Sequence, residues 1–180
     1  MVSSIYALLL QAYRRMPVLP RRWVVRTIAP SFTVGSMVVV ERSDGRILFV
    51  RQTYRTKWGV PGGLLKRRES ASDAAVREVF EEVGLRVELT GTPGVVIDAV
   101  PQRVDVVFRA RPMPGTDLDT LVPCSPEIEA IEWHAPNALP ELQFETAGAL
   151  VELARATQAE HRRPVSIDDL GNIFRDRPTG

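Results

Sequence analysis

The chain has 180 residues, of which 44% are hydrophobic and 25% charged, the composition of a globular protein with one core. Its 23 Lys and Arg residues nearly balance 22 Asp and Glu residues, so no overall field favours duplex nucleic acid or an acidic membrane. The single cysteine, Cys124, cannot form an internal disulfide and fits no metal-ligand spacing, which favours a reducing, cytoplasmic location.

The first 30 residues read as a segment of their own. Residues 4–16 have helical character and end at Pro17, and a basic, half-apolar stretch then runs to Pro30. The apolar run near the start is too short to span a bilayer and carries no cleavage signal. We predict a helical arm over residues 1–30 that packs on the domain or on a second subunit, with a membrane surface as the alternative.

Strand patterns begin after this arm, and the predicted domain spans residues 31–158, followed by a polar tail at 159–180. Asp44 and Gly45 separate two strand-like runs and predict a hairpin around an Asp-Gly turn. In chain order the expected elements are strands at 32–42 and 46–52, a loop at 53–63, a helix at 70–83, strands at 86–91, 94–100 and 103–110, a proline-rich loop at 111–126, a strand at 127–133 and a helix at 144–158.

The helix at 70–83 has clear end signals. Ser70 and Asp73 match a capping box, and Gly84 is placed to end the helix. Because each residue advances about 100° around a helix, Glu78, Glu81 and Glu82 fall on one side. The neighbouring arc is apolar and is expected to face the core. Its members are Val76, Val79, Phe80 and Val83.

The three glutamates are a poor choice for a merely solvated face. Glu78 and Glu82 form a like-charge pair four residues apart. Arg77 lies N-terminal to Glu81, which is the less favourable order for a helical ion pair at this spacing. A bound divalent cation would turn this repulsion into attraction. Oxygen ligands without His or Cys select Mg²⁺ or Mn²⁺, and Mg²⁺ held by a few carboxylates commonly binds substrate phosphates. The pattern therefore predicts metal-assisted transfer of a phosphoryl group to water.

The same segment resembles the signature of the Nudix hydrolases. Gly63 is followed after five residues by Glu69, and after seven more by "REVFEEVGL" at 77–85, which matches every specified position of that signature. The resemblance implies an α/β/α sandwich with a mixed β-sheet and divalent-metal-dependent hydrolysis of a nucleoside diphosphate linked to another moiety X.

Site residues follow from the resemblance position by position. Glu78 and Glu82 resemble the principal metal ligands, Glu81 a further ligand or base, and Gly63 a ligand through its carbonyl group. Glu69 and Arg77 resemble the pair that pins the loop to the helix.

Beyond the signature, some members of the family bring another glutamate to the metals. Glu127 has the matching spacing to Trp133, although Glu129 and Glu132 are alternatives. Arg51 is similar in position to residues that contact substrate.

The substrate is left open between two classes. Pro101 lies where ADP-ribose-type members have a proline, and Leu64 replaces a lysine found in some triphosphate-specific members, so a nucleoside diphosphate linked to X is favoured. Asn137 lies in a region where oxidised-purine triphosphatases of the MutT type use an asparagine, which supports a triphosphate instead.

Two other functions compete with these substrate classes. A nucleotide-sensing module without turnover is the second function class, and an RNA-decapping enzyme is the third. The expected partner is a small nucleotide, with no duplex nucleic acid and no membrane span, and the sequence leaves homodimer formation open.

Overall fold

The computed structural model describes residues 31–161 and, before them, residues 11, 13–15, 17 and 20. Its elements in chain order are β1 (Thr33–Val40), β2 (Ile47–Gln52), β3 (Gly62–Leu64), α3 (Ala71–Val83), β4 (Val87–Asp98), β5 (Arg103–Pro112), β6 (Ile128–His134) and α4 (Phe144–His161).

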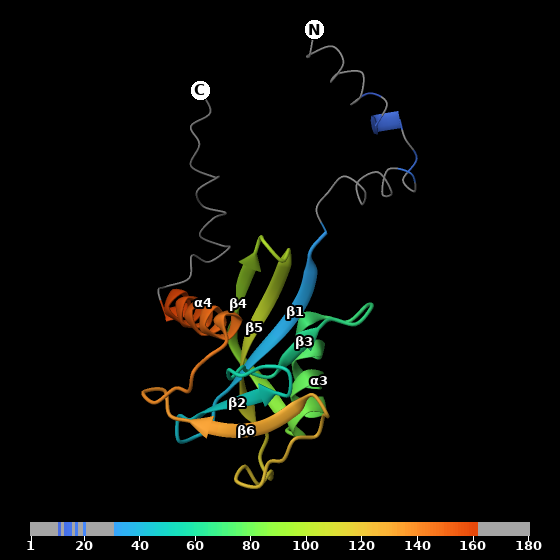
Figure 1. Ribbon diagram of the computed structural model, residues 1–180. Coiled ribbons are helices and arrows are strands. Elements are labelled where there is room, and N and C mark those ends of the chain that lie inside the picture. Colours follow the sequence, from blue (N-terminus) through green and yellow to red (C-terminus); the bar gives the residue numbers. More distant parts are fainter. Residues whose placement is uncertain (1–10, 12, 16, 18–19, 21–30, 162–180) are drawn as a thin grey trace, which may run out of the picture.

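The predicted α/β/α sandwich with a mixed sheet is confirmed. A four-stranded sheet has the order β3-β1-β5-β4, and α3 and α4 flank it (Figure 1). β1 runs parallel to β5, whereas β1 with β3 and β4 with β5 are antiparallel. β2 and β6 form a separate antiparallel pair. Within the part of the chain that the structure describes, no helix is long and apolar enough to cross a membrane.

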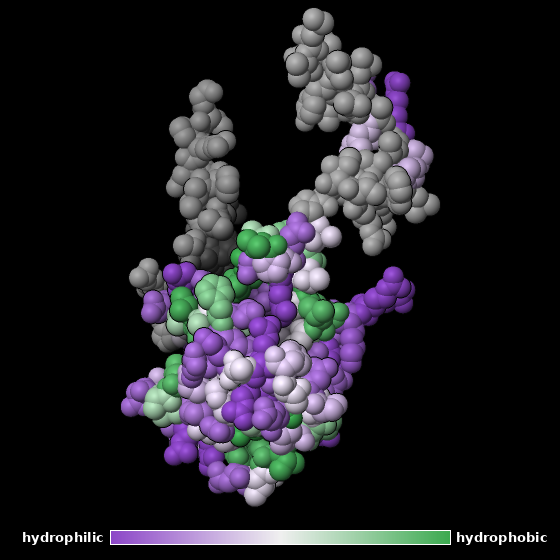
Figure 2. Space-filling view, viewed as in Figure 1, coloured by the Kyte–Doolittle hydropathy of each residue, from purple (hydrophilic) through white to green (hydrophobic). Residues whose placement is uncertain are grey.

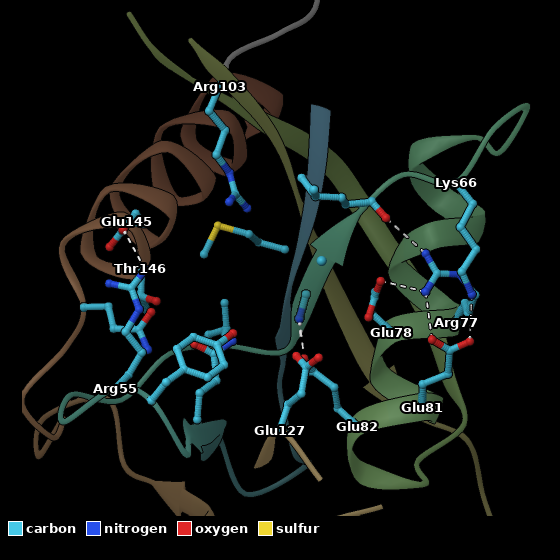
Figure 3. Close-up of a pocket in the computed structure, with 18 residues that line it drawn as sticks. Arg55, Lys66, Arg77, Glu78, Glu81, Glu82, Arg103, Glu127, Glu145 and Thr146 are labelled. Atoms are coloured by element: carbon cyan, nitrogen blue, oxygen red, sulfur yellow. Dashed lines mark hydrogen bonds and ion pairs between the residues drawn. The ribbon is translucent and has the colours of Figure 1, made fainter. Parts of the chain in front are cut away.

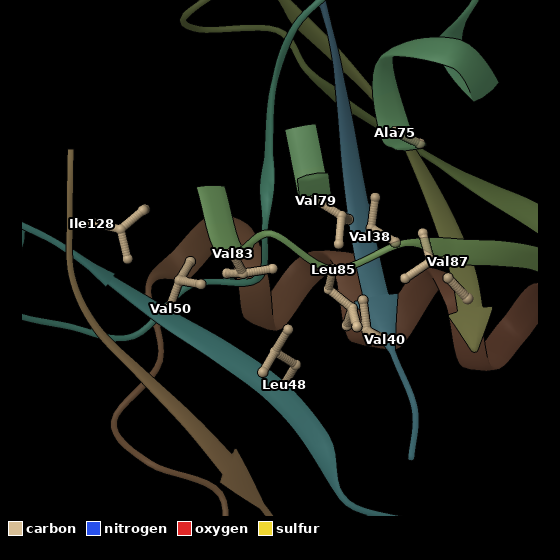
Figure 4. Close-up of a cluster of buried hydrophobic side chains, with 11 residues drawn as sticks. Val38, Val40, Leu48, Val50, Ala75, Val79, Val83, Leu85, Val87 and Ile128 are labelled. Carbon is tan, nitrogen blue, oxygen red and sulfur yellow. The ribbon is translucent and has the colours of Figure 1, made fainter. Parts of the chain in front are cut away.

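From Gly35 to Val40, β1 is buried on both faces, which explains the run of four apolar residues at its end. Val38 and Val40 face a core on the α3 side, and Met37 and Val39 face a second core on the α4 side. Full burial of one such side chain contributes about 1.5–3 kcal/mol, so both cores depend on this strand. The α3-side core also contains Leu48, Val50, Ala75, Val79, Val83, Leu85, Val87, Ala110 and Ile128 (Figure 4).

Both predicted ends of α3 are confirmed. The Ser70 hydroxyl accepts a hydrogen bond from the backbone N–H of Asp73 at 3.1 Å, which satisfies one of the free donors of the first turn. Gly84 adopts a left-handed conformation with φ of 68°, and its N–H donates to the carbonyl of Phe80. These two signals are local, which is why the sequence alone located them.

Three strand predictions were wrong. The Asp-Gly turn is present, but β1 and β2 share only the bridge between Glu41 and Ile47 and then diverge into different sheets. The runs at 86–91 and 94–100 belong to one strand, β4, which changes register between Thr90 and Gly94. The end of the expected loop at 53–63 begins strand β3, because its glycines pair with β1.

The predicted core-facing arc of α3 is correct only in part. Val79 and Val83 are buried, but Val76 and Phe80 are 38% and 49% exposed. The helix instead buries its alanine side together with Glu82, so one of its three glutamates turns inward. Phe80 packs at the surface below the guanidinium group of Arg86.

Exposed apolar side chains lie near the start of β1. Val34, Val104 and Ile97 are direct partners across β1, β5 and β4, and the two outer members are 39% and 67% exposed. Further apolar surface covers the β4–β5 turn, where it is green at the top of Figure 2. The arm predicted at 1–30 lies outside the described residues and stays a prediction, as do the boundaries of the domain and the tail.

Deletion of residues 1–30 is expected to change solubility or oligomer size more than the catalytic rate per site. The reason is that the segment supplies no carboxylate and precedes the first strand, while apolar surface is exposed where the chain enters β1. Size-exclusion chromatography and steady-state kinetics on the truncated protein would measure both effects. A folded truncation without activity would contradict the prediction.

Candidate functional site

A cleft of about 560 Å³ opens beside the acidic edge of α3 and extends to the start of α4 (Figure 3). Six of the predicted catalytic or metal-binding residues line it, and they come from three parts of the chain: strand β3, helix α3 and the loop before β6. They are Gly63, Arg77, Glu78, Glu81, Glu82 and Glu127.

Two glycines let β3 pass between β1 and α3. A Cβ atom on Gly63 would lie 2.4 Å from Oε1 of Glu78, and one on Gly62 would lie 2.3 Å from the carbonyl oxygen of Ser36. The first contact would push the carboxylate of Glu78 aside, and the second would be a clash with the backbone of β1. The backbone N–H of Gly62 donates to Oε2 of Glu82 at 3.3 Å, so the approach also aims a donor at the helix.

Arg77 joins the loop before α3 to the acidic edge of the helix. Its Nε and Nη2 donate to the two oxygens of Glu69 at 2.6 and 2.9 Å, and its Nη1 donates to Glu78 at 2.6 Å and Glu81 at 2.9 Å. The bond from Arg77, assisted by the N–H of Lys66, lowers the pKa of Glu69 to about 2. The less favourable order of Arg77 and Glu81 therefore does not prevent this ion pair.

The glutamates of α3 differ in their surroundings. Glu81 is half-exposed, and hydrogen bonds from Lys66 and Arg77 lower its pKa. Glu82 is only 6% exposed, and burial, followed by the charge of Glu78, raises its pKa to about 8. Among the described residues, the backbone N–H of Gly62 donates to its carboxylate, and this bond opposes the rise in pKa but does not reverse it.

The donor set suits a hard divalent cation. The charges of Glu78 and Glu127 repel the ionised form of the buried Glu82 carboxylate. A bound cation would offset this repulsion. Among residues 31–161, however, no three acidic, His or Cys side chains are grouped closely enough to hold an ion as they stand. Arg77 holds Glu78 and Glu81 in ion pairs, so coordination would require Glu78 to turn from Arg77 towards Glu82.

Other predicted residues lie outside the lining of the cleft. Arg51 bonds Glu129 and covers the ring of Trp58, and Glu132 bonds His134. Of the three glutamates considered before Trp133, Glu127 is therefore the one at the cleft.

Of the three residues that bore on the substrate class, Leu64 lines the cleft, whereas the other two lie away from it. Pro101 is exposed in the turn between β4 and β5, and Asn137 is exposed in the loop after β6.

The sequence analysis missed the wall opposite the glutamates. Arg55, Arg103, Glu145 and Thr146 line this wall, which the start of β5 and the start of α4 help to form. One signal was available, because Asp105 interrupts the apolar positions of β5 and shares a strand face with Arg103. The remaining residues come together only through the packing of α4 against the sheet.

Stability of the metal-free protein is expected to fall as pH rises from about 4.5 to about 8. Glu82 binds its proton more tightly in the folded state, where its pKa is about 8, than in the unfolded state, where it is near 4.5. Urea unfolding in a chelating buffer at pH 6 and pH 8 would measure the change. Glu82→Gln should remove much of the slope and be more stable than wild type at pH 8, whereas the exposed Glu88→Gln should not. An equal slope in both variants would contradict the assignment.

Comparison with known proteins places this geometry in a family. The family model of the NUDIX domain matches residues 31–154. A MutT-like protein of Streptomyces ambofaciens is 34% identical over 119 residues, covering 66% of this chain and 74% of the relative. A Bacillus subtilis protein with the provisional name 8-oxo-dGTP diphosphatase is 39% identical over 109 residues, 61% of this chain and 70% of its own.

A solved structure of an ADP-ribose pyrophosphatase from Streptococcus suis superimposes with a TM-score of 0.57 at 25% identity, covering 76% of this chain and 96% of its own. The family match spans most of the described domain, and it includes the signature whose glutamates line the cleft. The chain therefore belongs to the Nudix hydrolase family.

Proposed function

We propose that this Nudix hydrolase cleaves a phosphoanhydride bond of a nucleotide with Mg²⁺ or Mn²⁺ held by Glu78 and Glu82. The observation that carries the proposal is the buried carboxylate of Glu82, which faces the charges of Glu78 and Glu127 in the cleft. Members of the family generally require a divalent metal. The Gly63 carbonyl and Glu81 are the further proposed ligands.

The chemistry that a divalent cation supplies in such a site is neutralisation of phosphate charge and a lowered pKa of water. The protein's part is to position the reacting groups. Arg77, held by Glu69, orients Glu78 and Glu81. We assign the general base to Glu127, because the bonds from Lys66 and Arg77 that lower the pKa of Glu81 make it a weaker base.

Replacement of Glu78 or Glu82 by glutamine is expected to lower turnover by several orders of magnitude and leave the fold intact. Glu129→Gln is the matched control, because its carboxylate pairs with Arg51 away from the cleft. Steady-state rates with Mg²⁺ and with Mn²⁺ measure the effect. Mg²⁺ should also raise the melting temperature of the wild type and do so less in Glu82→Gln. Near wild-type rates in both variants would refute the metal assignment.

The structure bears on the choice between a nucleoside diphosphate linked to X and a nucleoside triphosphate. The preference for a nucleoside diphosphate linked to X, such as ADP-ribose, rested on Pro101 and Leu64. Pro101 is exposed outside the cleft lining, and Lys66, two residues after Leu64, supplies a cation at the rim. The provisional name of the Bacillus subtilis relative, 8-oxo-dGTP diphosphatase, also favours a triphosphate. We therefore favour a nucleoside triphosphate, with the likeness to an ADP-ribose pyrophosphatase supporting the second candidate.

The value of kcat/KM is expected to be higher for dGTP or 8-oxo-dGTP than for ADP-ribose, because Lys66 at the rim of the cleft offers a cation for additional phosphate charge. Release of a nucleoside monophosphate from the three compounds under identical metal conditions would measure the preference. A tenfold preference for ADP-ribose would restore the diphosphate class. Binding without turnover of any compound would support a sensing module instead.

A further inference from the structure

The wall of the cleft opposite the glutamates carries an arginine held by a buried carboxylate. Arg103 and Asp105 lie on the same face of β5, and Nε of Arg103 donates to both oxygens of Asp105 at 2.9 and 2.7 Å. Asp105 is only 5% exposed, whereas Arg103 lines the cleft and points into it (Figure 3). The carboxylate thus fixes the direction of the guanidinium group.

The neighbouring strand is shaped around this pair. Gly35 of β1 is the register partner of Asp105. A Cβ atom on Gly35 would lie 2.2 Å from Oδ1 of Asp105 and 2.9 Å from Nη2 of Arg103, so a side chain at this position would displace the pair. The ion pair is therefore built into the sheet and is not a chance surface contact.

Hydrogen-bond donors on this wall remain unused. A guanidinium group has five N–H donors, and the bonds found for Arg103 among the described residues use only the one on Nε. Thr146, at the start of α4, is 1% exposed, and its hydroxyl has no partner among the described residues. A buried polar group without a partner is costly, which indicates that a ligand completes it.

The charges on the wall are paired. Asp105 offsets Arg103, and Glu145 lies 3.7 Å from Arg55. Two nearly buried apolar side chains, Met37 and Val60, line the same cleft. A wall that is close to neutral, rich in donors and partly apolar suits a flat, uncharged group with hydrogen-bond acceptors better than it suits another phosphate.

We propose that this wall binds the base of the nucleotide and that Arg103 donates to the paired acceptors O6 and N7 of an unoxidised guanine or hypoxanthine base; the N7 of 8-oxoguanine carries a hydrogen and cannot accept this bond. Arginine makes this two-bond contact with guanine, whereas adenine presents an amino donor in place of O6. Asp105 is the positioning residue, because it acts through Arg103. The inference rests on the proposed function only in requiring that the ligand be a nucleotide.

The test measures binding without catalysis. Calorimetric titration of the metal-free protein with GMP, IMP and AMP separates the base from hydrolysis, and IMP carries O6 and N7 without the 2-amino group. GMP and IMP should bind about tenfold or more tightly than AMP. Arg103→Lys and Asp105→Asn should abolish this preference, and Thr146→Val should weaken GMP binding.

Arg109→Lys is the matched control. Arg109 lies on the same strand but pairs with Glu41 and does not line the cleft, so this variant should keep the preference. Equal affinity for GMP and AMP in the wild type, or an equal loss for both in Arg103→Lys, would overturn the assignment of the base. Preferential GMP binding by a protein that hydrolyses no nucleotide would refute the proposed function and leave this subsite standing.

Discussion

The contact between Arg77 and three carboxylates determines how the site is assembled. Glu69 comes from the loop before α3, and Glu78 and Glu81 come from the helix itself, so one guanidinium group ties the two segments together. Because Arg77 is largely buried, these ion pairs are screened less than surface pairs. Removal of the arginine would leave like charges facing one another at the cleft.

The close approach of β3 to the glutamates of α3 explains why this strand contains two glycines. Glu82 can be buried only if backbone approaches closely enough to give it a donor, and Gly62 provides that N–H. Gly63 then leaves room for the carboxylate of Glu78. Packing and electrostatics thus impose the same requirement on this short strand, which explains why two of its three residues paired with β1 are glycines.

In the function proposed here, the glutamate wall of the cleft carries the catalytic groups and the opposite wall binds the base of the substrate. The glutamate wall comes mainly from consecutive turns of α3, so its residues are close in sequence and carry a readable spacing. The opposite wall combines the start of β5 with the start of α4, which are about forty residues apart. Substrate choice can change on this second wall without disturbing the proposed metal ligands.

Although it left Glu127 open against Glu129 and Glu132, the sequence by itself determined the α/β class, both ends of α3 and five residues of the signature region that line the cleft. Those features depend on short-range signals: caps, helical period and fixed spacing. Only the tertiary structure decided that β1 and β2 separate, that Val76 and Phe80 face outward, and that Arg103 and Thr146 line the same wall of the cleft. Local periodicity cannot state which face of an element meets which partner, because that depends on burial summed over distant segments.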